Sequence, residues 1–303
     1  MNRLVIFAHY DKDCIVDDYV VYYLKALKEV ASDIVFVSCN KLENKEILDN
    51  IVTVVIDDPH NEYDFGSYKR GYLYAKDNLD KYDEIIFAND SCFGPFYPLK
   101  SICDNMSERE CDFWGITKNN FGIIYIKKPL IHPHIQSYFI VFKKQVFTSE
   151  VFADYINSIK EEENKKSVIE KYEIGLSDLL VKNGFKYDSY INAYKKVNNI
   201  PILRWYQIIL NYNMPFMKTS LIKHQNVKVT TISGFEDVIS KVSDYPISLI
   251  TNYMTRYGIK YKKCSKIFTK FKRFAFFIAS FSPIFVRRFL NFVFGFFLKK
   301  LKD

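Results

Sequence analysis

The 303-residue sequence lacks several patterns that mark familiar protein classes. Its six cysteines include no CxxC pair and no paired spacing typical of a disulfide framework or a zinc site, which indicates reduced thiols in a reducing cytosol. No G-x-G-x-x-G follows the first apolar run, which disfavours a Rossmann oxidoreductase. No recognisable nucleic-acid-binding motif is present, so we expect no nucleic-acid partner.

Long hydrophobic runs are missing from both ends of the sequence. The apolar run at residues 4–8 is too short for the core of a signal peptide, so we expect a cytoplasmic protein. In residues 266–303 the apolar runs alternate with Lys and Arg and are broken by Pro283 and by Arg287-Arg288. Each is shorter than the roughly 20 residues that a spanning helix needs.

Acidic residues are also absent from residues 257–302, although the whole chain carries a net charge of only +8. A segment rich in Phe, Lys and Arg suits an anionic membrane surface at least as well as nucleic acid. We therefore predict an amphipathic helical tail over residues 266–303 that lies on the inner face of the plasma membrane. The alternative is a helical pair buried against the rest of the protein.

Apolar runs and helical periodicity alternate in the first part of the chain. The expected strands are residues 4–8, 34–37, 52–56 and 84–88, and the expected helices are residues 16–30, 44–50 and 67–78. This alternation predicts an α/β protein with a Rossmann-type, mostly parallel sheet flanked by helices. Ligands of such sheets lie beyond the carboxyl ends of the strands.

The pattern changes in the second part of the chain. Strands are expected at residues 112–117 and 137–142, followed by helices at residues 150–163 and 174–183. We predict a sheet domain over residues 1–225, with a first half of about 1–110 and a second half of 111–225. A helical connection over residues 226–265 would join this domain to the tail.

Four motifs occur in order and carry a family resemblance: HNEYDFGSYKRG at residues 60–71, YDEIIFANDSCFGP at 82–95, DFWGIT at 112–117 and HIQSYF at 134–139. Over roughly residues 1–225 the sequence resembles the rhamnan synthesis F family of bacterial polysaccharide biosynthesis. The resemblance implies a glycosyltransferase that uses a nucleotide-sugar donor, with dTDP-rhamnose favoured. It also implies a lipid-linked glycan acceptor, such as that of an O-antigen, capsule or wall rhamnan.

The order of strand, Gly-containing turn, basic helix, strand and Asn-Asp-Ser resembles the nucleotide-sugar half of a GT-A fold. Asp90 falls where such enzymes keep a metal-binding Asp-x-Asp element, so we expect it to bind Mg²⁺ or Mn²⁺ at the donor diphosphate. Asn89 replaces one carboxylate, which puts strict metal dependence in doubt. Alternatively, Asp90 and Ser91 cap a turn.

Further donor-site residues follow from position. Asp64 and Gly66 precede the expected helix at 67–78, whose free N–H groups, with Lys69 or Arg70 one turn later, would suit a diphosphate. An ordinary helix cap is the alternative for Asp64. Residues at the ends of the first two strands would line the base and ribose: Tyr10, Asp11 and Ser38.

The acceptor side offers fewer candidates. His134 and Gln136 alternate on a strand edge and would hydrogen-bond sugar hydroxyls, whereas a metal site at His132 and His134 is a weaker alternative. Trp114 would stack on a sugar, unless it is simply buried.

The segment YEIGLSDLL at residues 172–180 is similar to the acidic motif that opens the acceptor-side helix of many GT-A enzymes. Glu173 matches the catalytic base, and an inverting transfer is expected for a dTDP-β-L-rhamnose donor. The alternative is an acidic residue that merely favours the helix dipole. The competing hypothesis for the whole protein is an inactive, membrane-associated scaffold of a polysaccharide assembly complex, which Asn89 would support.

Overall fold

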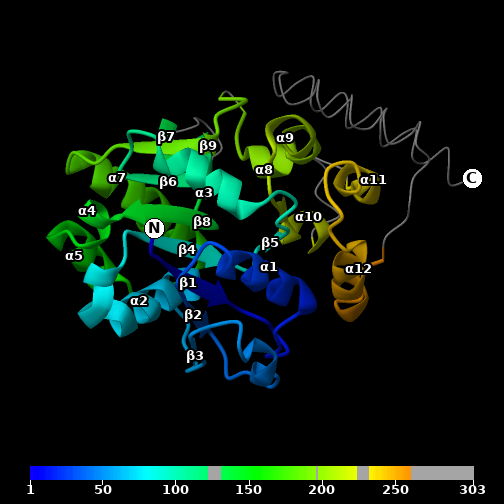
Figure 1. The fold of residues 1–303 in the computed structure, drawn as a ribbon, viewed down its shortest axis with the longest axis horizontal. Helices are drawn as coiled ribbons and strands as arrows, with labels where there is room; N and C mark the ends of the chain where they lie inside the picture. Colours follow the sequence, from blue (N-terminus) through cyan, green and yellow to red (C-terminus); the bar gives the residue numbers. More distant parts are fainter. Residues whose placement is uncertain (122–130, 196, 224–231, 261–303) are drawn as a thin grey trace, which may run out of the picture.

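The structure is a computed structural model that describes residues 1–121, 131–195, 197–223 and 232–260. Its centre is an eight-stranded sheet with the order β3-β2-β1-β4-β8-β6-β7, in which β9 also pairs with β6 (Figure 1). The strands are β1 (Arg3–His9), β2 (Asp33–Ser38), β3 (Val54–Ile56), β4 (Glu84–Asn89), β6 (Phe113–Phe121), β7 (Ile131–Ile135), β8 (Phe139–Lys143) and β9 (Tyr187–Ile191).

The direction of the strands divides this sheet into two parts. Strands β3, β2, β1 and β4 are mutually parallel, as the alternation of the first half predicts. Strand β8 runs antiparallel to both β4 and β6, β7 is antiparallel to β6, and β9 is parallel to β6. The predicted α/β fold, a Rossmann-type sheet flanked by helices, is therefore confirmed, and the sheet is mixed.

Helices cover both faces of the sheet. The longer ones are α1 (Asp18–Lys28), α2 (Tyr63–Ala75), α3 (Leu99–Ser107), α5 (Glu150–Ser158), α7 (Gly175–Lys182), α9 (Trp205–Tyr212) and α12 (Ile247–Arg256). Shorter helical segments are η1 (Lys45–Leu48), η2 (Lys76–Lys81), α4 (Lys144–Phe147), α6 (Lys165–Val168), η3 (Ile169–Ile174), α8 (Ile200–Leu203), α10 (Thr219–Lys223) and α11 (Phe235–Ile239).

Alternation along β1 creates two hydrophobic cores, because successive side chains of a strand point to opposite faces. Val5 and Phe7 pack in a core with α1, whereas Leu4 and Ile6 pack in a second core with α2. At Gly71 a Cβ atom would lie 2.3 Å from Cγ2 of Ile6. This glycine therefore allows α2 to lie directly on the sheet.

Several expected elements differ in extent from the predictions; helix α5, for example, ends at Ser158 and not at residue 163. Helix α2 begins at Tyr63, four residues before the expected start at residue 67. Residues 44–50 form only the short 3-10 helix η1, because a segment with so few buried residues gains little from packing as a longer helix. Boundaries of this kind depend on tertiary packing, which periodicity does not record.

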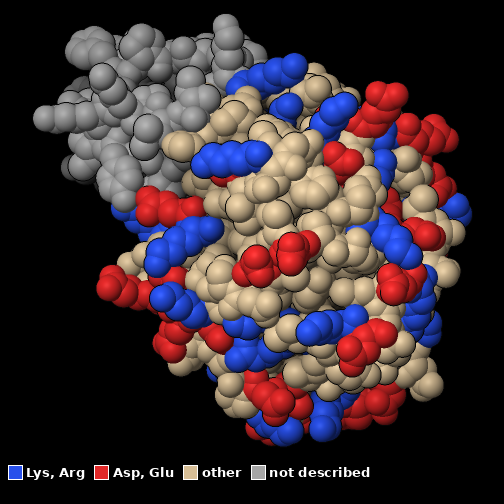
Figure 2. Space-filling view, turned by 90° about the vertical axis from the view of Figure 1, so that its left-hand side faces the viewer, with Lys and Arg blue, Asp and Glu red and all other residues tan. Residues whose placement is uncertain are grey.

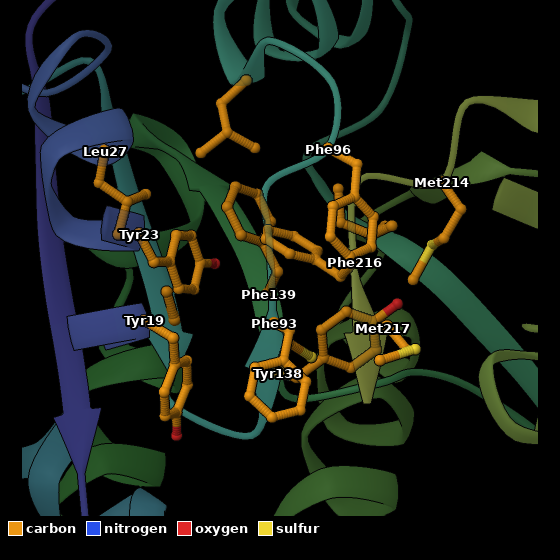
Figure 3. Close-up of a cluster of buried hydrophobic side chains, with 14 of the residues drawn as sticks. Tyr19, Tyr23, Leu27, Phe93, Phe96, Tyr138, Phe139, Met214, Phe216 and Met217 are labelled. Atoms are coloured by element: carbon orange, nitrogen blue, oxygen red, sulfur yellow. The ribbon is translucent and has the colours of Figure 1, made fainter. Parts of the chain in front are cut away.

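A small second sheet joins distant parts of the chain. Strand β10 (Met217–Lys218) pairs antiparallel with β5 (Cys92–Phe93). Figure 3 shows the aromatic cluster around this junction, in which side chains of α1 face those of β5 and β10. The ring centroids of Tyr19 and Phe93 are 4.9 Å apart, as are those of Tyr23 and Phe216. This packing fixes β10 beside the carboxyl end of β4.

Helices α11 and α12 belong to the same packed body. Phe235 of α11 and Ile250 and Tyr253 of α12 are buried in the core that contains α1. The predicted helical connection over residues 226–265 thus contains helices that pack on the sheet domain, as far as its residues are described. Figure 1 shows α12 beyond the carboxyl end of β1.

Charged side chains are interspersed over the described surface in Figure 2, with acidic and basic groups side by side. The predicted amphipathic tail over residues 266–303 lies outside the described residues. No helix within the described ranges is long and apolar enough to cross a membrane.

Candidate active site

Asp90 follows β4 directly and is held from two sides at the carboxyl edge of the sheet. Its Oδ2 atom accepts a hydrogen bond of 2.9 Å from the backbone N–H of Tyr10, which follows β1. The hydroxyl of Tyr19 donates to the carbonyl oxygen of Asp90 at 2.8 Å. Burial, followed by the nearby Asp64 carboxylate, raises the pKa of Asp90 to about 7.

Asp64 supplies a second carboxylate at this edge. It lies in the first turn of α2, and its Oδ2 atom accepts a hydrogen bond of 2.9 Å from Nδ2 of Asn89. Burial raises the pKa of Asp64 above its ordinary value. Helix α2 has Glu62 at its N-cap position, so Asp64 lies within the first turn and is not the N-cap residue. Asn89, the residue that departs from Asp-x-Asp, therefore orients a carboxylate contributed by another element.

The lysines that lower the pKa values of this acidic pair do so without forming an ion pair with it. Among the described residues, no lysine or arginine forms an ion pair with Asp64 or Asp90. His9 lies 3.9 Å from Asp90, but burial lowers the pKa of His9 to about 4, so its ring is neutral at neutral pH. A buried carboxylate whose pKa is raised by a second carboxylate in this way would be stabilised in its ionised form by a bound cation.

The donor set fits a hard divalent cation. Mg²⁺ is commonly held in proteins by one or two carboxylates together with substrate phosphates and water. Asp64 and Asp90 could supply such a pair of oxygen ligands. Within the described ranges, no group of three or more His, Cys, Asp and Glu side chains is arranged to hold a metal ion.

Lys218 reaches the same edge from β10. It is half-buried, and its Nζ atom donates to Oγ of Ser91 at 3.0 Å. Nζ also lies 3.9 Å from the ring centroid of Tyr138. Its charge lowers the pKa of Asp64, against the larger effect of burial. The sequence analysis assigned no role to Lys218, which ends the MPFMK segment at residues 214–218.

Asp11 is committed to a different network. Its Oδ1 atom accepts from Nη1 of Arg256 at 3.1 Å, and its Oδ2 atom accepts from Nη2 of Arg256 at 2.5 Å and from the Tyr257 hydroxyl at 2.6 Å. Arg256 also pairs with Asp13 and Asp17. Burial opposes ionisation of Asp11, but these donors hold its pKa below the ordinary value. Asp11 thus joins the β1–α1 loop to α12, a role that sequence reasoning did not anticipate.

The other positions expected to line the base and ribose differ in exposure. Tyr10 is 56% exposed beside Asp90, so its ring is accessible to a ligand. Ser38 is buried, and its Oγ atom lies 3.3 Å from Nδ1 of His9. Tyr10 thus lies beside Asp90, whereas Ser38 contacts the His9 ring.

Residues of α2 expected to contact phosphate have partners elsewhere. Nζ of Lys69 donates to the carbonyl oxygens of Asn157 and Ile159 at the end of α5. Arg70 forms an ion pair of 2.8 Å with Glu62. At Gly66, a Cβ atom would lie 2.4 Å from Cβ of Glu62, so this glycine serves close packing within the described structure. These contacts leave the phosphate role of the three residues without direct support.

Glu173 lies on the acceptor side within a hydrogen-bonded group. Its Oε2 atom accepts from the backbone N–H of Ser137 at 3.0 Å and from the Ser137 hydroxyl, and its Oε1 atom lies 3.6 Å from Nε2 of His134. Burial opposes ionisation, but His134 and Ser137 hold the pKa of Glu173 below the ordinary value. The Glu173 charge also raises the pKa of Asp64 slightly, so the two carboxylates interact.

His134 is the buried partner of this carboxylate. Burial alone would lower the pKa of His134, but Glu173 raises it above the ordinary value. Its Nδ1 atom bonds to the carbonyl oxygen of His132 at 2.7 Å. Both ring nitrogens therefore have protein partners.

The remaining acceptor candidates are also enclosed. Gln136 accepts a hydrogen bond of 2.8 Å from Thr117 and is largely buried. Trp114 has no exposed surface and packs against Phe139. Its expected stacking on a sugar is therefore corrected to burial, because β6 lies inside the sheet between β8 and β9.

The sequence is similar to a protein family and to two curated proteins. The model of a family described as rhamnan synthesis protein F matches residues 34–275. A curated relative, the uncharacterized protein y4gN of Sinorhizobium fredii, is 29% identical over 191 residues, 59% of this chain and 49% of that protein. The virulence protein VirA of Vibrio anguillarum is 29% identical over 128 residues, 41% of this chain and 38% of that protein. The chain thus spans half or less of the curated relatives it matches.

Two solved structures show distant likeness. A CMP:2-keto-3-deoxy-manno-octonic acid synthetase complexed with CTP is 10% identical with a TM-score of 0.39, covering 63% of this chain and 89% of that one. The core-mannan synthase A of Aspergillus fumigatus, in a Mn/GDP form, is 8% identical with a TM-score of 0.36, covering 63% and 73%. These scores are low, and neither likeness identifies a ligand of this chain.

Proposed function

The chain belongs to the rhamnan synthesis protein F family, and from this premise we propose that it is a glycosyltransferase of bacterial surface-polysaccharide synthesis. The observation that carries the proposal is the pair of Asp64 and Asp90 at the carboxyl edge of the parallel strands, with Lys218 beside it. This edge is where sheets of this kind bind nucleotides. The donor is a nucleotide sugar, with dTDP-L-rhamnose favoured by the family description.

The acidic pair would hold Mg²⁺ or Mn²⁺. When bound there, the ion would neutralise charge on the donor diphosphate. Tyr10 would contact the donor from the β1 side, since it is exposed and its backbone is fixed to Asp90. Asp11, Ser38, Gly66, Lys69 and Arg70 remain donor-site predictions from sequence, although the structure gives each another partner or a packing role.

Glu173 would act as the general base of an inverting transfer. Its lowered pKa keeps it ionised at neutral pH, and Ser137 and His134 orient the carboxylate. An ionised carboxylate can accept the proton of an acceptor hydroxyl as that hydroxyl attacks the anomeric carbon. His134 and Gln136 would shape the acceptor side from behind this base.

The acceptor would be a lipid-linked glycan at the cytoplasmic face of the plasma membrane. The basic, aromatic segment at residues 266–303 would bind anionic lipid. Removing residues 266–303 should abolish sedimentation of the protein with phosphatidylglycerol vesicles, whereas neutral vesicles should bind neither form. Unchanged sedimentation of the shortened chain would refute this part of the proposal.

Incubation with a panel of sugar nucleotides, dTDP-rhamnose among them, and a lipid-linked acceptor tests the central proposal. Saturable nucleotide binding with transfer of sugar is the expected result. Binding without transfer to any acceptor would favour the scaffold alternative. Absence of binding to every nucleoside diphosphate would refute a donor site at Asp64 and Asp90.

A further inference from the structure

We propose that Lys218 binds the diphosphate of the donor and stabilises the leaving nucleotide. This inference rests on the proposed function and adds to it a cationic residue that comes from outside the parallel sheet. Lys218 is opposite Cys92 in the antiparallel pair β5–β10, so it lies beside Ser91, the residue that follows Asp90. The pairing brings it to the carboxylate pair across more than a hundred residues of sequence.

A chain of hydrogen bonds joins Lys218 to the acidic pair. Lys218 donates to Oγ of Ser91 at 3.0 Å, and the Ser91 hydroxyl donates to Oδ1 of Asn89 at 2.6 Å. Asn89 in turn donates through Nδ2 to Asp64 at 2.9 Å. This series of hydrogen bonds holds the Lys218 ammonium and the Asp64 carboxylate on either side of the end of β4.

The groups that contact the Lys218 ammonium are all uncharged within the described structure. They are the Ser91 hydroxyl, the Cys92 thiol and the face of the Tyr138 ring. Tyr138 is itself held by a 2.6 Å hydrogen bond to Thr117. A half-buried ammonium with neutral contacts lacks the anionic partner that normally offsets its desolvation. An anionic ligand would supply that partner.

Diphosphate is the ligand chemistry that fits. An ammonium group binds phosphate as a compact point charge with several donors. Asp64 and Asp90 would repel an anion by themselves, so positive charge must offset them, and Lys218 contributes part of it. Lys218 would recognise the phosphates, so its contribution does not depend on the identity of the nucleobase.

The transfer step exchanges one bond of the anomeric carbon for another. The acceptor oxygen forms a bond to the anomeric carbon while the bond from that carbon to the diphosphate oxygen breaks, and the bonding electron pair leaves on that oxygen. The acceptor proton goes to Glu173. Lys218 stabilises the negative charge that develops on the diphosphate, as preorganised cations do in other group transfers.

A purely structural role is the competing explanation, because Lys218 also joins β10 to β5. Lys218→Met retains the aliphatic part that packs on Tyr138 but removes the charge. Lys218→Arg retains the charge. Lys100→Met removes an exposed lysine that pairs with Asp104 on α3, so it is the matched control.

Calorimetry of the full chain with dTDP and with inorganic pyrophosphate, in the presence of Mg²⁺, tests the proposal. Lys218→Met should weaken both ligands by about 10- to 100-fold, as expected for loss of a charge-assisted hydrogen bond. Binding of thymidine, followed by ligand-detected NMR, should stay within about twofold, because a nucleoside offers no phosphate. Lys218→Arg should lose much less than Lys218→Met, and Lys100→Met should match wild type.

The outcomes separate the two proposals. Two results would overturn the role of Lys218 and leave the proposed function intact. In the first, Lys218→Met binds dTDP as tightly as wild type. In the second, Lys218→Arg loses as much affinity for dTDP as Lys218→Met. Failure of the wild type to bind dTDP, UDP, GDP and CDP would refute the proposed function itself. Should Lys218→Met fail to fold, Lys218→Arg and Ser91→Ala decide, since Ser91→Ala should weaken pyrophosphate without removing the charge.

Discussion

Two carboxylates follow neighbouring parallel strands, and the protein treats them in opposite ways. Asp11, past the end of β1, accepts hydrogen bonds from Arg256 and Tyr257 that hold its pKa below the ordinary value. Asp90, past the end of β4, has no Lys or Arg ion-pair partner among the described residues, and its pKa is raised to about 7. The first carboxylate is compensated by protein donors, whereas the second has no such compensation among the described residues, which supports our proposal that it binds a cation.

This contrast separates positions that sequence analysis grouped together. Both residues were expected at the donor site because ligands bind beyond the carboxyl ends of parallel strands. The position is common to both, but the compensation of charge is not. The inference is that a buried carboxylate without a protein cation is the better indicator of a site.

Glu173 provides the strongest test of that contrast, because it is paired with His134 yet is proposed to act in catalysis. Glu173→Gln should lower kcat by about 10²- to 10⁴-fold with donor affinity retained, because a positioned base is lost. Asp178→Asn, in α7 directly after the segment η3 that contains Glu173, is the comparison variant and should change kcat by less than about threefold, far below the range for a lost base. A Glu173→Gln enzyme with more than about a third of wild-type kcat would transfer the assignment to Asp178.

Asp90→Ala tests the uncompensated carboxylate directly. Transfer should fall by about 10²- to 10³-fold, because several kcal/mol of charge stabilisation depend on the acidic pair. Folding should change little, since the variant removes a carboxylate that Asp64 repels. Steady-state kinetics and thermal unfolding measure the two effects. Full activity in excess EDTA with unchanged donor affinity would refute the metal role.

Arg256→Met tests the compensated side. The free energy of unfolding should fall by about 2 kcal/mol, because Asp11, Asp13 and Asp17 lose their shared cation. Arg256 is partly exposed, so the effect should be smaller than for a fully buried pair. Urea unfolding measures it, with Arg70→Met as a control that breaks one ion pair, to Glu62, and one hydrogen bond, to the carbonyl oxygen of Gly66. A loss no greater than that of the control would contradict the network.

The smallest expected effect is the loss of stability on replacing His134, whose pKa is raised by Glu173 and also by the charge of Asp178. The His134 pKa is raised above 6.5, so its contribution is complete below pH 6.5 and fades as pH rises through the higher folded value. The Glu173 pKa is lowered below 4.5, so its contribution is complete above pH 4.5 and fades in more acidic solution.

Wild type should therefore exceed His134→Gln in stability by about 1 kcal/mol between pH 4.5 and 6.5, with the difference shrinking on either side. Urea unfolding across this range measures the difference, and Gln136→Ala serves as a control without a titrating group. A difference that stays constant with pH would show that His134 and Glu173 do not form a charged pair.

Much of the sheet and the position of Asp90 at its edge followed from the sequence. The strands β1, β2 and β4 are apolar runs, and burial on both faces requires such runs in parallel strands. Asp90 follows the last of them in the chain, so its place at the sheet edge is a local consequence of strand order. Trp114 shows the limit of this reasoning, because residue type alone did not decide between stacking and burial.

The sequence by itself determined the alternation of strands and helices, and with it the edge at which polar side chains gather. Only the tertiary structure decided which of them meet. The first turn of α2 places Asp64 against Asn89, while helical geometry directs Lys69 toward α5. Lys218 reaches Ser91 only because β10 pairs with β5, and long-range pairing of this kind leaves no period in the sequence.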